Sequence, residues 1–378
     1  MGLSIAGFLV IAGLTGAVIA FEPELDAALN PRLFKAQAPL SQPALPLEAL
    51  IRRVESANPG IAVTSALLPL KRSDNVIIRV KARDAGRPLA FDQVFVDPGS
   101  GVIRGERKWG TCCLQSENLV PFLYQVHMSL FLPDRAGTLL MGGVALLWLF
   151  DSFTGLVLAW PKGQTGRKAW LRTLTIKSGA LGFRVIFDWH RILGLWPWPV
   201  LIILAMTGVS LNLRQELFTP VVRLFSPLTP GVFDQPLPGN RGPASIGYGK
   251  AAAIAVAAAR SHMPDPVIVY ACHVADAGVY GFAVARSKGD PRNGLGPSWY
   301  YIDDITGSLR DRQLMGKGTA GDVFMQAQLP LHNGRIAGLP GRIAISIIGI
   351  LVAALSVTGV VIWWRKMSAR RRVTLRYR

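Results

Sequence analysis

The segment 331-LHNGRIAGLPGRIAISIIGILVAALSVTGVVIWWRK-366 decides the fold. Residues 341–364 of this segment are almost entirely apolar, and about 20 apolar residues suffice for a helix to cross a bilayer. His332, Arg335 and Arg342 stand at the beginning of the run. Ionisable side chains in such places are costly and commonly functional. The segment therefore predicts a membrane helix with a functional histidine near one end, and that histidine needs a counterpart elsewhere.

The rest of the chain has the composition of a membrane protein. Its 378 residues are 50% hydrophobic and only 17% charged, which is too apolar for an ordinary soluble protein. The predicted fold class is a membrane α-helical protein with α+β inserts, in two tandem helix–insert–helix repeats. Its parts are four transmembrane helices (1–21, 137–160, 190–212 and 341–364), two inserts (22–136 and 213–340), a basic loop (161–189) and a basic tail (365–378).

The first apolar run is predicted to stay in the chain as a membrane helix. No positive charge precedes Gly7, whereas a cleaved signal peptide usually begins with a positively charged region. Val18 and Ala20 nevertheless fit a signal-peptidase site, so the cleaved alternative stays open.

The positive charge has a definite location, which predicts the orientation of the helices. The net charge is +18, and thirteen cations lie in two short stretches, 162–184 and 365–378, that contain no acid. They are Lys162, Arg167, Lys168, Arg172, Lys177 and Arg184, then Arg365, Lys366, Arg370, Arg371, Arg372, Arg376 and Arg378. Short basic segments of this kind stay on the cytoplasmic side. We therefore expect both termini in the cytoplasm, both inserts outside, and membrane lipid rather than nucleic acid as the partner of the charge.

An internal repeat relates the two halves. "LTGAVIAFEPELD" (14–26) matches "MTGVSLNLRQELF" (206–218), "FVDPGSGVIRGER" (95–107) matches "YIDDITGSLRDRQ" (301–313), and "FTGLVLAWPK" (153–162) matches "VTGVVIWWRK" (357–366). Each insert also reads as a helix followed by strands. Functional sites of repeated membrane proteins commonly lie where the halves meet.

The repeat gives His332 its counterpart. His332 precedes Thr358 by 26 residues and His127 precedes Thr154 by 27, with Arg342 and Arg135 downstream of the respective histidines. At about 1.5 Å per residue, both histidines belong near the outer membrane face, where the symmetry of the repeat brings them towards each other.

A third histidine, His190, opens the third predicted span near the inner face. It precedes Thr207 by 17 residues, and the equivalent position in the first half would precede residue 1. The Thr-Gly pairs of the spans are interpreted as helix-packing elements. Pro197 and Pro199 are expected to kink the third span.

Two neutral imidazoles that face each other from different helices are suited to axial ligation of a haem iron. We therefore interpret His127 and His332 as haem ligands, with His190 as a further ligand and Arg135 and Arg342 as partners of the propionates. Zinc would need three or four ligands, and the histidines are too few. His262 and His273, in the second insert, are interpreted as ordinary residues.

The cysteines do not predict a cofactor site. Cys112, Cys113 and Cys272 form no CxxC or CxxCH motif, which argues against covalent c-type haem and a thiolate zinc site. A disulfide from Cys112 or Cys113 to Cys272 and three free thiols are the two alternatives.

The helices with the patterns H…GR…TG…W and WHR…TG, together with the paired inserts, resemble the PepSY-associated transmembrane helix family over essentially the whole chain. Within it the arrangement is similar to bacterial inner-membrane siderophore reductases. The resemblance implies two periplasmic PepSY-type domains, one or two b-type haems and reduction of a ferric siderophore. His127, His332 and His190 match the family's histidines, whereas the first helix lacks the histidine expected there.

The resulting hypothesis is transmembrane electron transfer from a quinol or a cytoplasmic reductant, through haem, to a ferric siderophore outside. No catalytic triad or carboxylate pair is needed for that reaction. A PepSY-type binding or regulatory protein without redox activity is the main alternative, and under it the histidines would be dispensable. A chelate permease is the third, but Asp151 is almost the only charge within spans two and four.

Overall fold

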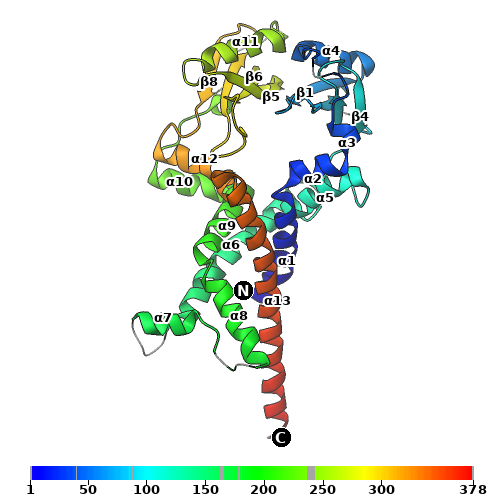
Figure 1. Ribbon diagram of the computed structural model, residues 1–378. Helices are drawn as coiled ribbons and strands as arrows, with labels where there is room; N and C mark the ends of the chain where they lie inside the picture. Colours follow the sequence, from blue (N-terminus) through cyan, green and yellow to red (C-terminus); the bar gives the residue numbers. More distant parts are fainter. Residues whose placement is uncertain are drawn as a thin grey trace. The chain divides into compact units, whose positions relative to one another are not determined.

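The computed structural model describes residues 2–39, 41–84, 86, 88–161, 166–177, 179, 181–235 and 243–376. The chain divides into two compact units (Figure 1). The helical unit contains residues 1–21, 123–222 and 331–378, and the sheet unit contains residues 22–122 and 223–330. Each unit is therefore assembled from both halves of the sequence.

The long helices of the helical unit are apolar enough to cross a membrane. Among the described residues, three single helices are long and apolar enough to cross a membrane, and one bent helix pair brings the number of candidate spans to four. They are α1 (Gly2–Ile19), α6 (Asp134–Ala159), α13 (Gly338–Arg376) and the pair α8 (Phe183–Leu195) with α9 (Trp198–Asn212). Shorter elements of this unit are α7 (Arg167–Thr173) and η4 (Arg335–Ala337), and the π-helical turn η1 (Arg214–Phe218) continues into α10 (Thr219–Phe225).

The third span confirms the predicted kink but differs from the prediction in its start. Helices α8 and α9 meet at a 65° bend, and Pro197 occupies the break. Proline interrupts the hydrogen-bond ladder of a helix because it has no N–H. Since α8 begins at Phe183, His190 lies in the middle of α8 rather than at the start of a span at residue 190.

Small residues let α1 and α13 pack closely side by side (Figure 1). A Cβ on Gly13 would overlap the Gly349 carbonyl oxygen, and a Cβ on Gly349 would overlap that of Gly13. Ser346 Oγ also donates to the Ala17 carbonyl at 2.6 Å. Such close backbone approach is how small residues stabilise membrane helix pairs.

The sheet unit contains one continuous sheet of eight strands in the order β4-β3-β2-β1-β5-β6-β7-β8. All neighbours are antiparallel. The first insert supplies β1 (Ile61–Leu67), β2 (Val76–Ala82), β3 (Gln93–Val96) and β4 (Ile103–Arg107), and the second supplies β5 (Pro266–Val274), β6 (Val279–Arg286), β7 (Ser298–Asp303) and β8 (Leu309–Gln313). The inserts were expected as separate domains, but pairing of β1 with β5, Ser65 opposite Cys272, joins them.

The helices of the two inserts share one hydrophobic core. Val54 of α4 (Leu47–Ala57) and Ala251 and Ala255 of α11 (Tyr248–Ala259) are fully buried in the same cluster as Ile78 and Phe282 of the sheet. Since this core includes side chains from both inserts, the two inserts form one packing unit. The short elements η2 (Val232–Asp234) and η3 (Ala275–Ala277) connect parts of the second insert.

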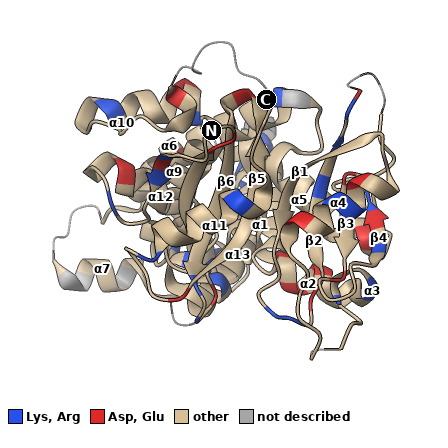
Figure 2. Cartoon of the chain, turned by 90° about the horizontal axis from the view of Figure 1, so that it is seen from above, with Lys and Arg blue, Asp and Glu red and all other residues tan. Residues whose placement is uncertain are grey.

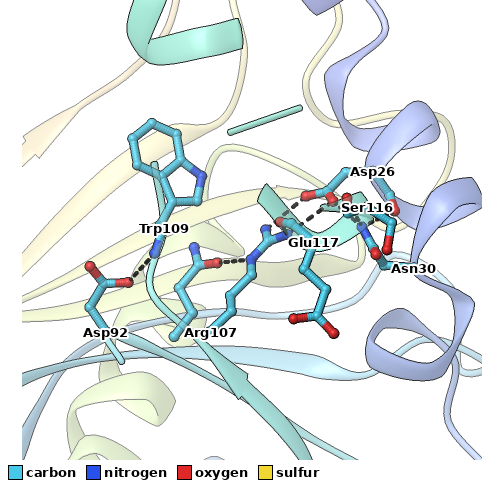
Figure 3. A network of polar contacts seen from close by, with 8 residues as sticks. Asp26, Asn30, Asp92, Arg107, Trp109, Ser116 and Glu117 are labelled. Carbon is cyan, nitrogen blue, oxygen red and sulfur yellow. Dashed lines mark hydrogen bonds and ion pairs between the residues drawn. The ribbon is translucent and has the colours of Figure 1, made fainter. Parts of the chain in front are cut away.

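A buried ion pair fixes the remaining helices of the sheet unit, α2 (Glu22–Leu29), α3 (Pro31–Phe34) and the start of α5 (Ser116–Ser129). Figure 3 shows the Arg107 guanidinium pointing at Asp26, with Nη2 2.7 Å from Oδ2. Arg107 also donates to the Glu117 carbonyl at 3.1 Å, and Asn30 donates to the Ser116 carbonyl at 2.9 Å. These bonds attach both α2 and α5 to the end of β4.

The turns that follow β3 and β7 are built alike. Asp97 Oδ1 accepts the backbone N–H groups of Gly99 and Ser100, and Asp303 Oδ1 accepts those of Ile305 and Thr306. A carboxylate that accepts the N–H groups two and three residues ahead forms an Asx turn. The motifs "VDPGSGVI" and "IDDITGSL" are therefore turn-forming sequences.

Figure 2 shows residues of both charge signs around α2, α3 and β4.

The cysteines follow neither alternative from the sequence. Cys112 and Cys113 form a disulfide with each other. Cys272 is a free thiol on β5 whose Sγ donates to the Gly281 carbonyl at 3.6 Å. The bridge to Cys272, one of the two alternatives, is therefore not formed in this structure.

Candidate histidine site in the membrane helices

His127, near the C-terminal end of α5, docks onto the last turns of α1. Its Nδ1 lies 3.0 Å from the Ala12 carbonyl oxygen and 3.1 Å from Thr15 Oγ1. The Thr15 hydroxyl is already donating to the Ile11 carbonyl at 2.6 Å. The next residue is Gly16, where an added Cβ would be only 2.9 Å from His127 Cε1. The glycine therefore leaves the space that the imidazole occupies.

His332, the last residue of α12 (Ala320–His332), docks onto α9 in the same way. Its Nδ1 lies 2.9 Å from Thr207 Oγ1, and the Thr207 hydroxyl donates to the Ile203 carbonyl at 2.7 Å. Gly208 follows, and a Cβ there would lie 4.0 Å from His332 Cε1 and 3.2 Å from Ala145 Cβ. Gly208 therefore serves both the imidazole and the packing of α9 on α6.

His190 repeats the arrangement on α13. Its Nδ1 lies 2.9 Å from Thr358 Oγ1, whose hydroxyl donates to the Ala354 carbonyl at 2.8 Å. A Cβ on Gly359 would lie 3.3 Å from His190 Cε1. Three Thr-Gly pairs on three different helices thus each contact one imidazole.

These contacts define the tautomer of each histidine. A threonine hydroxyl has one proton, and in all three cases a backbone carbonyl already accepts it. The hydroxyl oxygen can therefore only accept from the imidazole, which assigns the proton to Nδ1. Nε2 then carries the lone pair, and this is the form in which a neutral imidazole binds a metal.

The two imidazoles near the ends of α5 and α12 lie together. The ring centres of His127 and His332 are 6.1 Å apart and the rings are tilted by 56°. A metal held between two imidazole nitrogens at about 2.0–2.1 Å each would separate the ring centres by roughly 6 Å. No group of three or more His, Cys, Asp and Glu side chains suited to a metal occurs among the described residues. The spacing of the pair is thus close to that of two imidazoles that bind one metal ion.

His190 lies at a different level of the helical unit. Ser346 of α13 lies next to Ala17 of α1, two residues beyond Thr15. Thr358 follows the level of Thr15 by about ten residues of α13, which is about 15 Å along the helix. The structure thus brings His127 and His332 together and leaves His190 apart from them.

The two arginines predicted beside the site have different surroundings. Arg342 is buried, donates from Nε to the Ala20 carbonyl at 2.8 Å and stacks on the Phe21 ring at 4.5 Å. It thereby caps the C-terminal end of α1. Arg135, its repeat equivalent, is exposed and forms an ion pair with Glu216. The two residues share a repeat position but not a contact pattern.

The sequence interpretation of the Thr-Gly pairs as helix-packing elements was incomplete. Gly13 and Gly349 make a close helix contact without belonging to a Thr-Gly pair, whereas Gly16 and Gly359 accommodate imidazoles. The sequence does contain a signal for these sites, because a Thr-Gly pair occurs once in each predicted span. The fourth pair, Thr154-Gly155 on α6, has nothing within 4 Å of a Cβ at Gly155 among the described residues.

The remaining histidines belong to the sheet unit and have ordinary partners. His262 Nε2 lies 2.8 Å from Arg312 Nη1. His273 Nε2 lies 3.0 Å from Asp304 Oδ2, and its ring stacks on Tyr280 at 4.4 Å.

A comparison with protein families matches residues 1–366 to the family described as "PepSY-associated TM region". The chain belongs to this family. The resemblance deduced from the sequence is thereby confirmed at family level, and a membrane protein with PepSY association is established. A search of curated proteins finds no significant match to this PepSY-associated protein.

Proposed function

We propose that this PepSY-associated protein is a haem b-containing reductase of the bacterial inner membrane. It would pass electrons across the membrane to a periplasmic ferric siderophore and release the iron as Fe(II). The observation that carries the proposal is the pair of imidazoles, His127 and His332. Their ring centres are 6.1 Å apart and both Nδ1 atoms are engaged by helix groups.

The residues fit a haem in donor type and spacing. His127 and His332 would hold the iron through their Nε2 atoms, one imidazole from each half of the repeat. A bound haem supplies reversible one-electron chemistry at its iron. The protein supplies two neutral ligands in fixed tautomers, placed among apolar helices that exclude water. His190, about 15 Å away along α13, would hold a second haem nearer the cytoplasmic side.

The overall reaction is a one-electron reduction of the chelated metal. A quinol or a cytoplasmic reductant gives up the electron, and Fe(III) in the siderophore becomes Fe(II). Fe(II) carries one charge less and is a softer ion, so hard oxygen ligands hold it more weakly. No protein bond is made or broken, which agrees with a chain whose candidate site consists of metal ligands.

The proposed orientation follows from the charges. The basic segments 161–189 and 365–378 would lie in the cytoplasm, as short segments rich in Lys and Arg do. The sheet unit would then lie in the periplasm. Arg135 and Arg342 are the proposed partners of the haem propionates. Arg135 is the more accessible of the two, since its side chain is 67% exposed beside Glu216.

A pyridine haemochromogen assay on the purified protein tests the proposal. The wild type is expected to contain b-type haem at one or two equivalents, and the His127→Ala/His332→Ala double variant is expected to lose one equivalent. His262→Ala is the matched control, because His262 belongs to the sheet unit and contacts Arg312.

A wild-type protein without haem, or a double variant that keeps the full haem content, would contradict the proposal. The PepSY-type binding or regulatory protein without redox activity would then be the better interpretation. Its activity would survive replacement of both histidines.

A further inference from the structure

The three imidazoles are held by a repeated structural unit, which we call the Thr-Gly site. Each site consists of a threonine, the glycine after it and the carbonyl three residues before it. The carbonyl is a second acceptor for the threonine hydroxyl: Ala12 for Thr15, Leu204 for Thr207 and Leu355 for Thr358. The hydroxyl oxygen in turn lies 2.9–3.1 Å from Nδ1 of one imidazole at each site on α1, α9 and α13.

The threonine hydroxyl constrains the imidazole in two ways. It holds the proton on Nδ1, and it limits rotation of the ring because the hydroxyl is itself fixed to its helix turn by its own hydrogen bond. A hydrogen bond from the far nitrogen of a metal-bound imidazole also raises the basicity of the nitrogen that binds the metal. A more basic ligand favours the more highly charged oxidation state of the metal.

We propose that Thr15, Thr207 and Thr358 are positioning residues that set the orientation and donor strength of the histidine ligands, and thereby keep the midpoint potential of the haem low. This inference rests on the proposed haem function. It assigns to the three threonines a role that acts through the histidines they contact.

Replacement of Thr207 by valine tests the inference with little change of shape. Valine keeps the branched side chain but removes the oxygen that accepts from His332. Loss of such a second contact typically costs about 10–100-fold in metal affinity. A tenfold loss confined to the ferric form raises the potential of a one-electron couple by about 59 mV. We therefore expect Thr207→Val to raise the midpoint potential by at least that order and to weaken haem retention.

Two further variants separate positioning from mere stability. Thr207→Ser keeps the acceptor and should restore the wild-type potential. Thr154→Val makes the same change at the Thr-Gly pair of α6, where a Cβ on Gly155 would meet none of the described residues within 4 Å. It should leave the potential of the haem between His127 and His332 unchanged. All variants are compared by spectroelectrochemical titration and by melting temperature in detergent.

The outcomes distinguish this inference from the proposed function. A wild type without haem overturns the proposed function and the inference with it. Haem present with the same potential in Thr207→Val and the wild type overturns the inference alone. A shift in melting temperature without a shift in potential also overturns it, because that result indicates a structural role. If Thr207→Val does not accumulate, Thr15→Val decides the question, since Thr15 contacts the other imidazole.

Discussion

Adding one methyl group at Gly16 tests directly whether the glycine exists to accommodate His127. In the Gly16→Ala variant the new Cβ would lie 2.9 Å from His127 Cε1 and 3.3 Å from Nδ1, whereas ordinary contacts begin at 3.4 Å. The imidazole must therefore retreat by about half an ångström. That movement takes Nδ1 away from the Ala12 carbonyl and Thr15.

Gly155→Ala is the matched control for this variant. It makes the same change after Thr154 on α6, where a Cβ meets nothing within 4 Å. Alanine is favoured over glycine in a helix by about 1 kcal/mol, and this gain is common to both variants. Overpacking typically costs 1–3 kcal/mol, so Gly16→Ala is expected to be less stable than Gly155→Ala by about that amount.

Thermal unfolding in detergent, followed by circular dichroism, measures the difference. Gly16→Ala should melt below Gly155→Ala, and under the proposed function it should also lose part of the haem absorbance that Gly155→Ala retains. Equal melting temperatures together with equal haem spectra would refute the steric argument, because the imidazole would then have room to spare.

Three further predictions concern other parts of the chain. Asp26→Asn removes the charge that faces buried Arg107 and should destabilise the sheet unit by about 3–5 kcal/mol. Lys35→Met, at the exposed ion pair with Asp74, is the control and should cost at most about 1 kcal/mol. Equal denaturation midpoints of the two variants would contradict the difference between buried and exposed pairs. Burial alone would raise the pKa of Asp97, but four backbone N–H groups lower it below its ordinary value of 3.8. The Asp97 carboxylate therefore contributes stability above pH 3.8 that is lost as the pH falls further, through the folded-state pKa. Between pH 6 and pH 2, the melting temperature of the wild type should fall more steeply than that of Asp97→Asn. Parallel curves would refute this role of the Asp97 carboxylate. A reporter that fluoresces only in the cytoplasm should be active when fused after Arg378 and inactive when inserted at Gly289, and the reverse pattern would contradict the proposed orientation.

The sequence predicted the membrane helices well because their signal is local. About 20 apolar residues are required wherever a helix crosses hydrocarbon. The run 341–364 lies within α13, and the run 137–160 extends only one residue beyond the end of α6. The kink at Pro197 was predictable for the same reason, since a proline acts on its own helix turn. The start of the third span was less accessible, because Phe183–Leu195 is amphipathic and its polar residues obscure the apolar run.

The repeat was the source of the candidate pair, and it was informative because equivalent positions in repeated halves become neighbours in space. His127 and His332 share such a position, and their rings lie 6.1 Å apart. The threonines were missed because a Thr-Gly pair in an apolar helix is equally suited to helix packing. Only the hydrogen bond from Nδ1 to the hydroxyl distinguishes the two roles.

Contacts between segments that are distant in the sequence could not be predicted from the segments one at a time. The β1–β5 contact that joins the two inserts depends on which strand edges meet, and each strand by itself carries no information about its partner. The bond between Asp26 and Arg107 connects residues 81 positions apart. The repeat suggested two similar, separate domains. The two inserts share one sheet and one core instead, because each set of four strands leaves an edge strand, β1 or β5, whose unpaired N–H and C=O groups the other edge strand can pair.

The central claim is that one iron is shared by His127 and His332, and electron paramagnetic resonance of the oxidised protein tests it most directly. The wild type should show a low-spin ferric signal typical of two imidazole ligands, and either His127→Ala or His332→Ala alone should convert that signal to high spin. A low-spin signal of unchanged intensity in both single variants would contradict the claim.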